Sequence, residues 1–209
     1  MTPEGTGKRE KMKGVQGTIR KKAARAAQVV LFIGVLLPGI LPAHSYAQDK
    51  GQELLAAAAK GDVRKVEKLL AARADVNTTD MDDKTPLILA SLGGHTQVVR
   101  LLIGAGAEVN AKDNLETTAL IWASMSPGRP EVVKLLVAAK ADVNATDIAG
   151  RTALMMASLG GRAEVVRLLI AAGAEVNIRD IYGFTALTMA SEKNHAEVVN
   201  ILKQTGAKR

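Results

Sequence analysis

The sequence of 209 residues contains no cysteine and few aromatic residues. The absence of cysteine excludes disulfides and thiolate metal sites, so the stability of the folded chain depends on packing alone. It also excludes a lipid anchor attached to a cysteine. Only three aromatic residues follow position 47, and they are Trp122, Tyr182 and Phe184. Two of the three are neighbours, which makes the segment around them a candidate for function.

Residues 48–209 also lack an excess of positive charge, although the formal net charge of the whole chain is +7. Residues 1–47 hold eight Lys/Arg and two Glu, so they carry +6. Residues 48–209 hold 20 Lys/Arg and 19 Asp/Glu. A nucleic-acid-binding protein carries its basic surface on the folded part. The near balance of charge in the folded part therefore excludes a nucleic-acid partner.

Residues 1–47 have the features of a signal peptide of bacterial type. A basic stretch comes first, the apolar run VVLFIGVLLPGIL follows at 29–41, and Ser45 and Ala47 are the small residues at the −3 and −1 places. This order predicts cleavage after Ala47 and export to the periplasm or the medium. The apolar run is shorter than the roughly 20 residues of a bilayer span. Retention of the leader as a membrane anchor nevertheless stays open, and Met12 is a second candidate start.

Residues 48–209 consist of copies of one pattern. The stretch VVRLLIGAGAEVNAKD at 98–113 recurs as VVRLLIAAGAEVNIRD at 165–180, with 13 of 16 letters the same. Val-Asn pairs recur at steps of 33, 34 and 33 residues, with the asparagines Asn77, Asn110, Asn144 and Asn177. A period in this range predicts a stack of small supersecondary units. We place the units at approximately 50–79, 80–112, 113–146, 147–179 and 180–209.

The unit at 80–112 indicates how each copy folds. Thr85 before Pro86 predicts the start of a first helix, because threonine caps free N–H groups and proline fits the first helical position. The apolar face of this helix is expected to consist of Leu87, Leu89 and Ala90. Residues 98–103 predict a second helix with one buried stripe, and Gly106 follows it as the left-handed residue. Neither helix is long enough to be stable alone in water, so a unit is expected to be stable only in a row.

The pattern D-x-x-G-x-T-x-L-x-x-A, followed by E-V-V-x-L-L and V-N, is similar to the ankyrin repeat. The resemblance covers about 50–209 and implies an all-α solenoid. Its helix-turn-helix units are joined by β-hairpin-like turns, and residues 51–77 are similar to a helical capping unit at the N-terminal end. The family often has a histidine after Thr-Pro-Leu. Here apolar contact is expected to replace it, because the residues at that place are Ile88, Ile121, Met155 and Thr188.

Two glycine places of the family pattern also differ. The turn glycine is replaced by Asp83 and Glu116 in two units, and the helix-ending glycine is replaced by Arg73 and Lys140. We expect a left-handed backbone at these places, where a residue other than glycine costs about 1 kcal/mol. Replacing Lys140 with glycine is therefore expected to stabilise the protein.

The resemblance implies that the turn tips and the exposed ends of the first helices line a concave face that binds another protein. In this sequence those positions are Met81, Asp82, Lys84 and Leu92; Asn114, Leu115, Thr117 and Met125; Ile148, Ala149, Arg151 and Leu159; and Ile181, Tyr182, Phe184, Glu192 and Lys193.

Several of these positions are apolar, and along the later turns they form a stripe of Leu115, Ile148, Ile181, Tyr182 and Phe184. Surface aromatics often mark the centre of an interface. Two interpretations stay open: the stripe binds a partner, or adjacent turns stack and cover these side chains. Trp122 lies instead in a predicted first helix, at the place of Leu89, and is expected in the core.

No residue pattern supports catalysis, a cofactor, a metal site or a small-molecule substrate. His95 and His195 lie in different units, each just before a second helix, where the family often has a structural histidine. No Ser-His-Asp order and no phosphate loop occurs. Four aspartates recur once per unit and are expected to form turns: Asp80, Asp113, Asp147 and Asp180.

These observations favour a non-catalytic protein-binding module that is exported to the periplasm and is monomeric. The identity of the protein partner cannot be inferred from the sequence. Two alternatives stay open. The chain is a membrane-tethered scaffold of the cell envelope, or it is a secreted effector or immunity-type inhibitor.

Overall fold

A computed structural model describes residues 43–125 and 130–208 of the chain. Over these residues the chain forms ten helices and no extended strand. The predicted signal peptide up to residue 42, with its apolar run at 29–41, lies outside the described residues. Within the described part, none of the helices combines the length and the hydropathy that crossing a bilayer requires.

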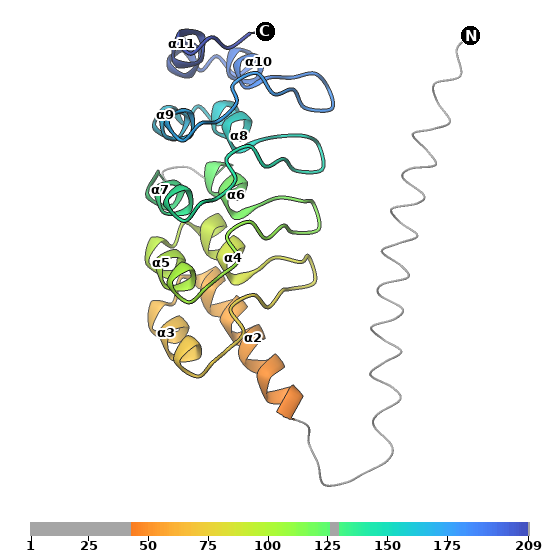
Figure 1. Cartoon of the computed structure of the whole chain (residues 1–209), viewed down its shortest axis with the longest axis vertical. Coiled ribbons are helices and arrows are strands. Elements are labelled where there is room, and N and C mark those ends of the chain that lie inside the picture. The colour runs from red at the N-terminus through yellow and green to blue at the C-terminus, as the bar shows by residue number, and fades with distance from the viewer. Residues whose placement is uncertain (1–42, 126–129, 209) are drawn as a thin grey trace, which may run out of the picture. The chain divides into compact units, whose positions relative to one another are not determined.

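The helices come in pairs that stack unit upon unit (Figure 1). The first helices of the pairs are α2 (Ala43–Lys60), α4 (Pro86–Gly93), α6 (Ala119–Met125), α8 (Ala153–Leu159) and α10 (Ala186–Glu192). The second helices are α3 (Val63–Ala71), α5 (Thr96–Gly104), α7 (Pro130–Ala138), α9 (Ala163–Ala171) and α11 (Ala196–Gln204). Figure 1 shows one column of first helices beside one column of second helices, with the turns projecting from the side of the first helices. The predicted all-α stack of helix pairs is confirmed.

Threonine caps begin the first helices of the four units after the capping unit, as predicted. The side chain of Thr85 accepts a hydrogen bond from the Ile88 amide at 3.3 Å, and Pro86 occupies the first turn. The same bond recurs in the other units, from Ile121 N to Thr118, from Met155 N to Thr152 and from Thr188 N to Thr185. Each cap satisfies one of the amides that a helix leaves unpaired at its start.

The core lies between the columns and between successive units. Helix α4 contacts the first helices α2 and α6 on either side and its own partner α5. The expected apolar face of α4 is corrected at one position, because Ile88 is buried and Leu89 is only half-buried. A helix enclosed on three sides buries more than one stripe, so Leu87, Ile88 and Ala90 are all inaccessible. In α5 the predicted stripe is confirmed at Val98, Val99 and Leu102, which are buried. Leu101 and Ile103, which were expected in the same stripe, are only half-buried at the edge of the core.

Apolar residues occupy the place of the family's histidine in three units. Ile88, Ile121 and Met155 are each about 1% exposed, which confirms the expected apolar contact. The last unit differs, because the Thr188 hydroxyl accepts from the Thr185 amide at 2.7 Å and donates to the Thr185 carbonyl at 2.9 Å. There the side chain closes a capping box within its own helix.

The asparagine of each Val-Asn pair links two successive units. Its side-chain oxygen accepts a hydrogen bond from a backbone amide 31 or 32 residues further along the chain. The four bonds run from Glu108 N to Asn77, from Asp142 N to Asn110, from Glu175 N to Asn144 and from Lys208 N to Asn177, at 2.7–2.9 Å. One polar residue per unit therefore fixes the position of the next unit.

The left-handed backbone predicted at the replaced glycines is confirmed. Lys140 has φ 66° and Arg73 has φ 58° at the ends of second helices, and Asp83 and Glu116 have φ 60° and 57° in the turns. The helix-ending glycine Gly173 adopts φ 89° at the equivalent place. The repeat thus imposes one backbone path whichever residue is present, and the non-glycine residues are strained.

The turns that join the units are hairpin-like. Isolated antiparallel bridges pair Lys112 with Thr118 and Thr146 with Thr152, on either side of two turns. These bridges agree with the β-hairpin-like connections that the repeat pattern implies.

The first helix of the capping unit is longer than the repeat pattern predicts. Helix α2 begins at Ala43, so the predicted boundary after Ala47 falls inside it. The Lys50 amine donates to the Ala72 carbonyl at 3.2 Å, which ties this part of α2 to the end of α3. The cleavage position itself stays a prediction.

We predict that Lys140→Gly raises the free energy of unfolding by about 1 kcal/mol, because the substitution relieves a left-handed backbone at an exposed position. Urea unfolding of the wild-type and variant chains measures the difference.

The matched control is Gly173→Ala, which adds a side chain at the equivalent place of the next unit. No heavy atom lies within 4 Å of an added Cβ there, so the expected loss of about 1 kcal/mol comes from the backbone alone. An unchanged or lower midpoint for Lys140→Gly would contradict the assigned strain.

Candidate functional site

An aspartate side chain organises each of the four turns. One carboxylate oxygen of Asp147 accepts hydrogen bonds from the amides of Ala149 and Arg151, both at 2.9 Å. Equivalent pairs of bonds hold the turns that begin at Asp80, Asp113 and Asp180. This confirms the predicted turn-forming role of the four aspartates. Three of them are more than 90% buried, so the turns are rigid supports.

Main-chain hydrogen bonds connect each turn to the next, and we call this series the turn ladder. In each of these bonds the donor is the amide of the residue that follows the aspartate of one turn. The acceptor is a carbonyl of the turn before it, and it belongs to the second residue after that turn's own aspartate. The three bonds run from Asn114 N to Asp82 O at 2.9 Å, from Ile148 N to Leu115 O at 2.9 Å and from Ile181 N to Ala149 O at 3.0 Å. Figure 1 shows the turns in one line beside the first helices. The turn ladder fixes the spacing of the side chains on the turns.

Large apolar side chains are exposed along these turns. We call them the turn row: Met81 at 101% exposed, Leu115 at 49%, Ile148 at 57%, Ile181 at 66%, Tyr182 at 71% and Phe184 at 37%. The fourth turn carries three of the six. All six side chains keep a solvent-exposed part, which contact with a partner requires.

The C-terminal ends of the first helices carry a second set, the helix-end row of Leu92, Met125, Leu159 and Glu192. Leu92 and Met125 are 36% and 37% exposed, Leu159 is half-buried and Glu192 is exposed. Lys193, which follows α10, is exposed as well. The two rows lie at opposite ends of the same helices, since the turns precede these helices and the helix-end row closes them.

Polar members of the predicted set accompany the turn row. The Lys84 amine donates to an Asp82 carboxylate oxygen at 2.8 Å, and this hydrogen bond raises the pKa of Lys84 above its ordinary value. The Arg151 guanidinium holds the second carboxylate oxygen of Asp147 at 2.7 Å. Asn114 is exposed, whereas Ala149 is half-buried and contributes mainly its carbonyl to the turn ladder.

The predicted exposure of one contact residue is wrong. Thr117 was expected on the exposed tip, but it is only 4% exposed. Its amide donates to Asp113 at 2.8 Å and its hydroxyl donates to the Leu115 carbonyl at 3.4 Å. Because both polar groups bond within the turn, the side chain folds back beneath the tip and cannot reach a partner.

The prediction that Trp122 lies in the core is also corrected. The indole is half-buried and packs against the edge of the core. Its N–H donates to the second carboxylate oxygen of Asp113 at 2.8 Å. An indole prefers to place its N–H on an acceptor, so this side chain reaches from α6 to the base of the turn and braces it.

Both histidines link successive units, which confirms their expected structural role. His95 Nε2 lies 3.1 Å from the Ala59 carbonyl, and His195 Nε2 lies 3.0 Å from the Leu159 carbonyl. A carbonyl only accepts, so Nε2 carries the proton in each ring. A side chain on Gly61 would collide with the His95 imidazole. The glycine is therefore part of the same contact.

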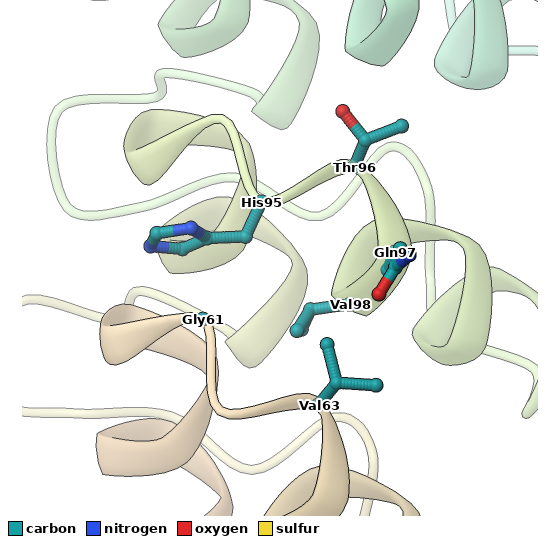
Figure 2. A pocket seen from close by; sticks show the side chains of 6 residues that line it. All are labelled: Gly61, Val63, His95, Thr96, Gln97 and Val98. Carbon is teal, nitrogen blue, oxygen red and sulfur yellow. The ribbon is translucent and has the colours of Figure 1, made fainter.

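A small hollow lies beside His95 where the capping unit meets the next unit (Figure 2). Its volume is about 240 Å³, and its lining includes Gly61, Val63, Thr96, Gln97 and Val98. Figure 2 shows the His95 ring above Gly61, with Val63 and Val98 facing each other beside it. Ligand pockets are usually larger, at about 300–1,000 Å³, and the histidine ring is already bonded. We interpret the hollow as a gap between units.

The part of the chain that the structure describes contains no group of three His, Cys, Asp or Glu side chains arranged to hold a metal ion. The exposed apolar side chains of the two rows are the candidate functional surface.

Sequence reasoning missed the contacts between units. The asparagines were used only as markers of the repeat, although their recurrence in every unit was a signal of their linking role. The turn ladder left no signal at all, because main-chain groups bond whatever the side chain.

Comparison with known families agrees with the geometry. The family model described as ankyrin repeats (three copies) matches residues 54–147 and 140–208. A search of curated proteins finds no match. The family matches span most of the chain and coincide with the helix pairs described above. The chain therefore belongs to the ankyrin repeat family.

Proposed function

We propose that the protein is a non-catalytic module that binds a protein partner through the turn row and the helix-end row. Ankyrin repeats generally mediate protein–protein interaction. The observation that carries the proposal is the exposed apolar turn row, which ends in the three neighbours Ile181, Tyr182 and Phe184. Large contiguous apolar patches are uncommon on the surfaces of soluble monomers and mark interaction sites.

The energetics favour the fourth turn as the anchor. Burial of a large apolar side chain is worth about 1.5–3 kcal/mol, and tyrosine is enriched among residues that dominate binding energies. Tyr182 is 71% exposed, so most of this gain is still available to a partner. The aspartate bonds and the turn ladder hold the row in place before binding, which reduces the entropy that a partner must overcome.

A binding role without catalysis is supported by how the polar groups are used. The four turn aspartates accept backbone amides, and both histidine rings bond to carbonyls of the preceding unit. In the described structure these groups hold turns and join units, which is the use expected of them in a binding module. We propose that the module works as a monomer and uses no cofactor.

We also propose that the protein is exported to the periplasm with removal of its leader. The support is the order of basic residues, a 13-residue apolar run and small residues before position 48. N-terminal sequencing of the protein isolated from its cells tests this, and a start at Gln48 is expected. A start upstream of residue 29 would contradict cleavage and favour the tethered scaffold, and recovery of the protein from the medium would favour a secreted effector or inhibitor.

We predict that the double substitution Tyr182→Ala, Phe184→Ala weakens partner binding at least tenfold, which corresponds to about 1.4 kcal/mol. A photo-crosslinking residue at position 182 first captures the partner, which mass spectrometry identifies. The dissociation constant of the purified pair is then measured for wild-type and double-variant chains. Circular dichroism and a thermal melt establish that the variant is folded.

The matched control is the double substitution Lys203→Ala, Gln204→Ala, which changes exposed residues on α11 of the same unit. We expect the control to bind within twofold of the wild type. Binding by the Tyr182, Phe184 variant with unchanged affinity would refute the turn row as the contact surface.

A further inference from the structure

The turn ladder follows one rule at each of its steps. In the first three turns the carbonyl two residues after the aspartate accepts an amide from the following turn, and these carbonyls belong to Asp82, Leu115 and Ala149. The lengths of 2.9–3.0 Å are those of well-formed N–H···O bonds. In each turn this carbonyl is therefore directed toward the place of the next turn.

Tyr182 holds the same place in the fourth turn. Asp180 accepts the amides of Tyr182 and Phe184 at 2.9 Å, so the fourth turn has the same internal bonds as the other three. No donor among residues 43–125 and 130–208 reaches the Tyr182 carbonyl. The carbonyl is an acceptor on the edge of the ladder, aligned by the same bonds that align the three occupied ones.

The side chains around this carbonyl suit a polypeptide. Ile181, Tyr182 and Phe184 are 66%, 71% and 37% exposed and flank the open acceptor. At the opposite edge of the ladder Met81 is accompanied by the exposed acidic residues Asp82 and Asp83. An unpaired main-chain edge beside apolar side chains is the arrangement that recruits an extended segment.

We propose that the fourth turn binds an extended segment of the protein partner, which donates a backbone N–H to the Tyr182 carbonyl. Because the exposed side chains beside this carbonyl are apolar, the donating residue of the partner is expected to be apolar and to pack on Ile181, Tyr182 and Phe184. This inference rests on the proposed protein-binding function and specifies the chemistry of its partner.

The probe is a 12-residue peptide selected on the full chain from a random library displayed on phage. The peptide is resynthesised with a single N-methyl group at each position in turn, which removes one N–H at a time. We expect N-methylation at one apolar position to weaken binding at least tenfold. The carbonyl ¹³C resonance of Tyr182 is expected to shift on binding, whereas that of Ala149, already bonded to Ile181, stays in place.

Protein variants locate the peptide. Tyr182→Ala is expected to lower the affinity for the peptide at least tenfold. The matched change Leu115→Ala in the second turn is expected to leave the affinity within twofold of the wild type. Failure to select any peptide, tolerance of N-methylation at every position, or an unmoved Tyr182 carbonyl would each overturn the inference. Peptides whose binding is weakened by Leu115→Ala and not by Tyr182→Ala would also overturn the inference. That result would still support the turn row as a binding surface.

Discussion

Each unit of this protein depends on its neighbours to cover its apolar faces. Helix α4 is only eight residues long, yet Leu87, Ile88 and Ala90 are inaccessible because α2, α5 and α6 enclose them. A helix of this length is not stable alone in water. Burial of one large apolar side chain contributes about 1.5–3 kcal/mol, and several are buried at every junction between units. With no cysteine in the chain, this mutual coverage is the main source of stability.

The position of the exposed rows follows from the same coverage. Successive units pack in one register, because the asparagine oxygen of each unit accepts an amide of the next and the turns bond to one another. Identical placement of the units puts equivalent turn residues in line. The side chain of Tyr182 can then be exposed without a loss of stability in the turn, because the hydrogen bonds to Asp180 hold the turn in place. The aspartate of a turn thus contributes to stability, while the exposed residues of the same turn remain accessible for the proposed binding.

Much of this fold was predictable because the sequence contains several copies of one unit, so that equivalent positions can be compared within the chain. Thr85 before Pro86 predicted the caps of the first helices in the repeated units. The glycine that ends the second helix in other units predicted the left-handed backbone at Lys140 and Arg73. The candidate surface was predicted only in outline. Thr117 is buried because its own amide and hydroxyl bond within the turn, and Trp122 reaches an aspartate nine residues away. Such outcomes depend on side-chain reach and on contacts between units, which a pattern of residue types does not contain.

Removal of the last unit tests the mutual coverage of units most directly. Urea unfolding is compared between the full chain and a chain that ends at residue 179, which exposes the face of α8 that α10 covers. Coverage by neighbours predicts that the free energy of unfolding falls by at least about 2 kcal/mol, and that the dependence on urea becomes shallower as less surface is buried. A truncated chain with the same free energy of unfolding as the full chain would show that the units are stable on their own.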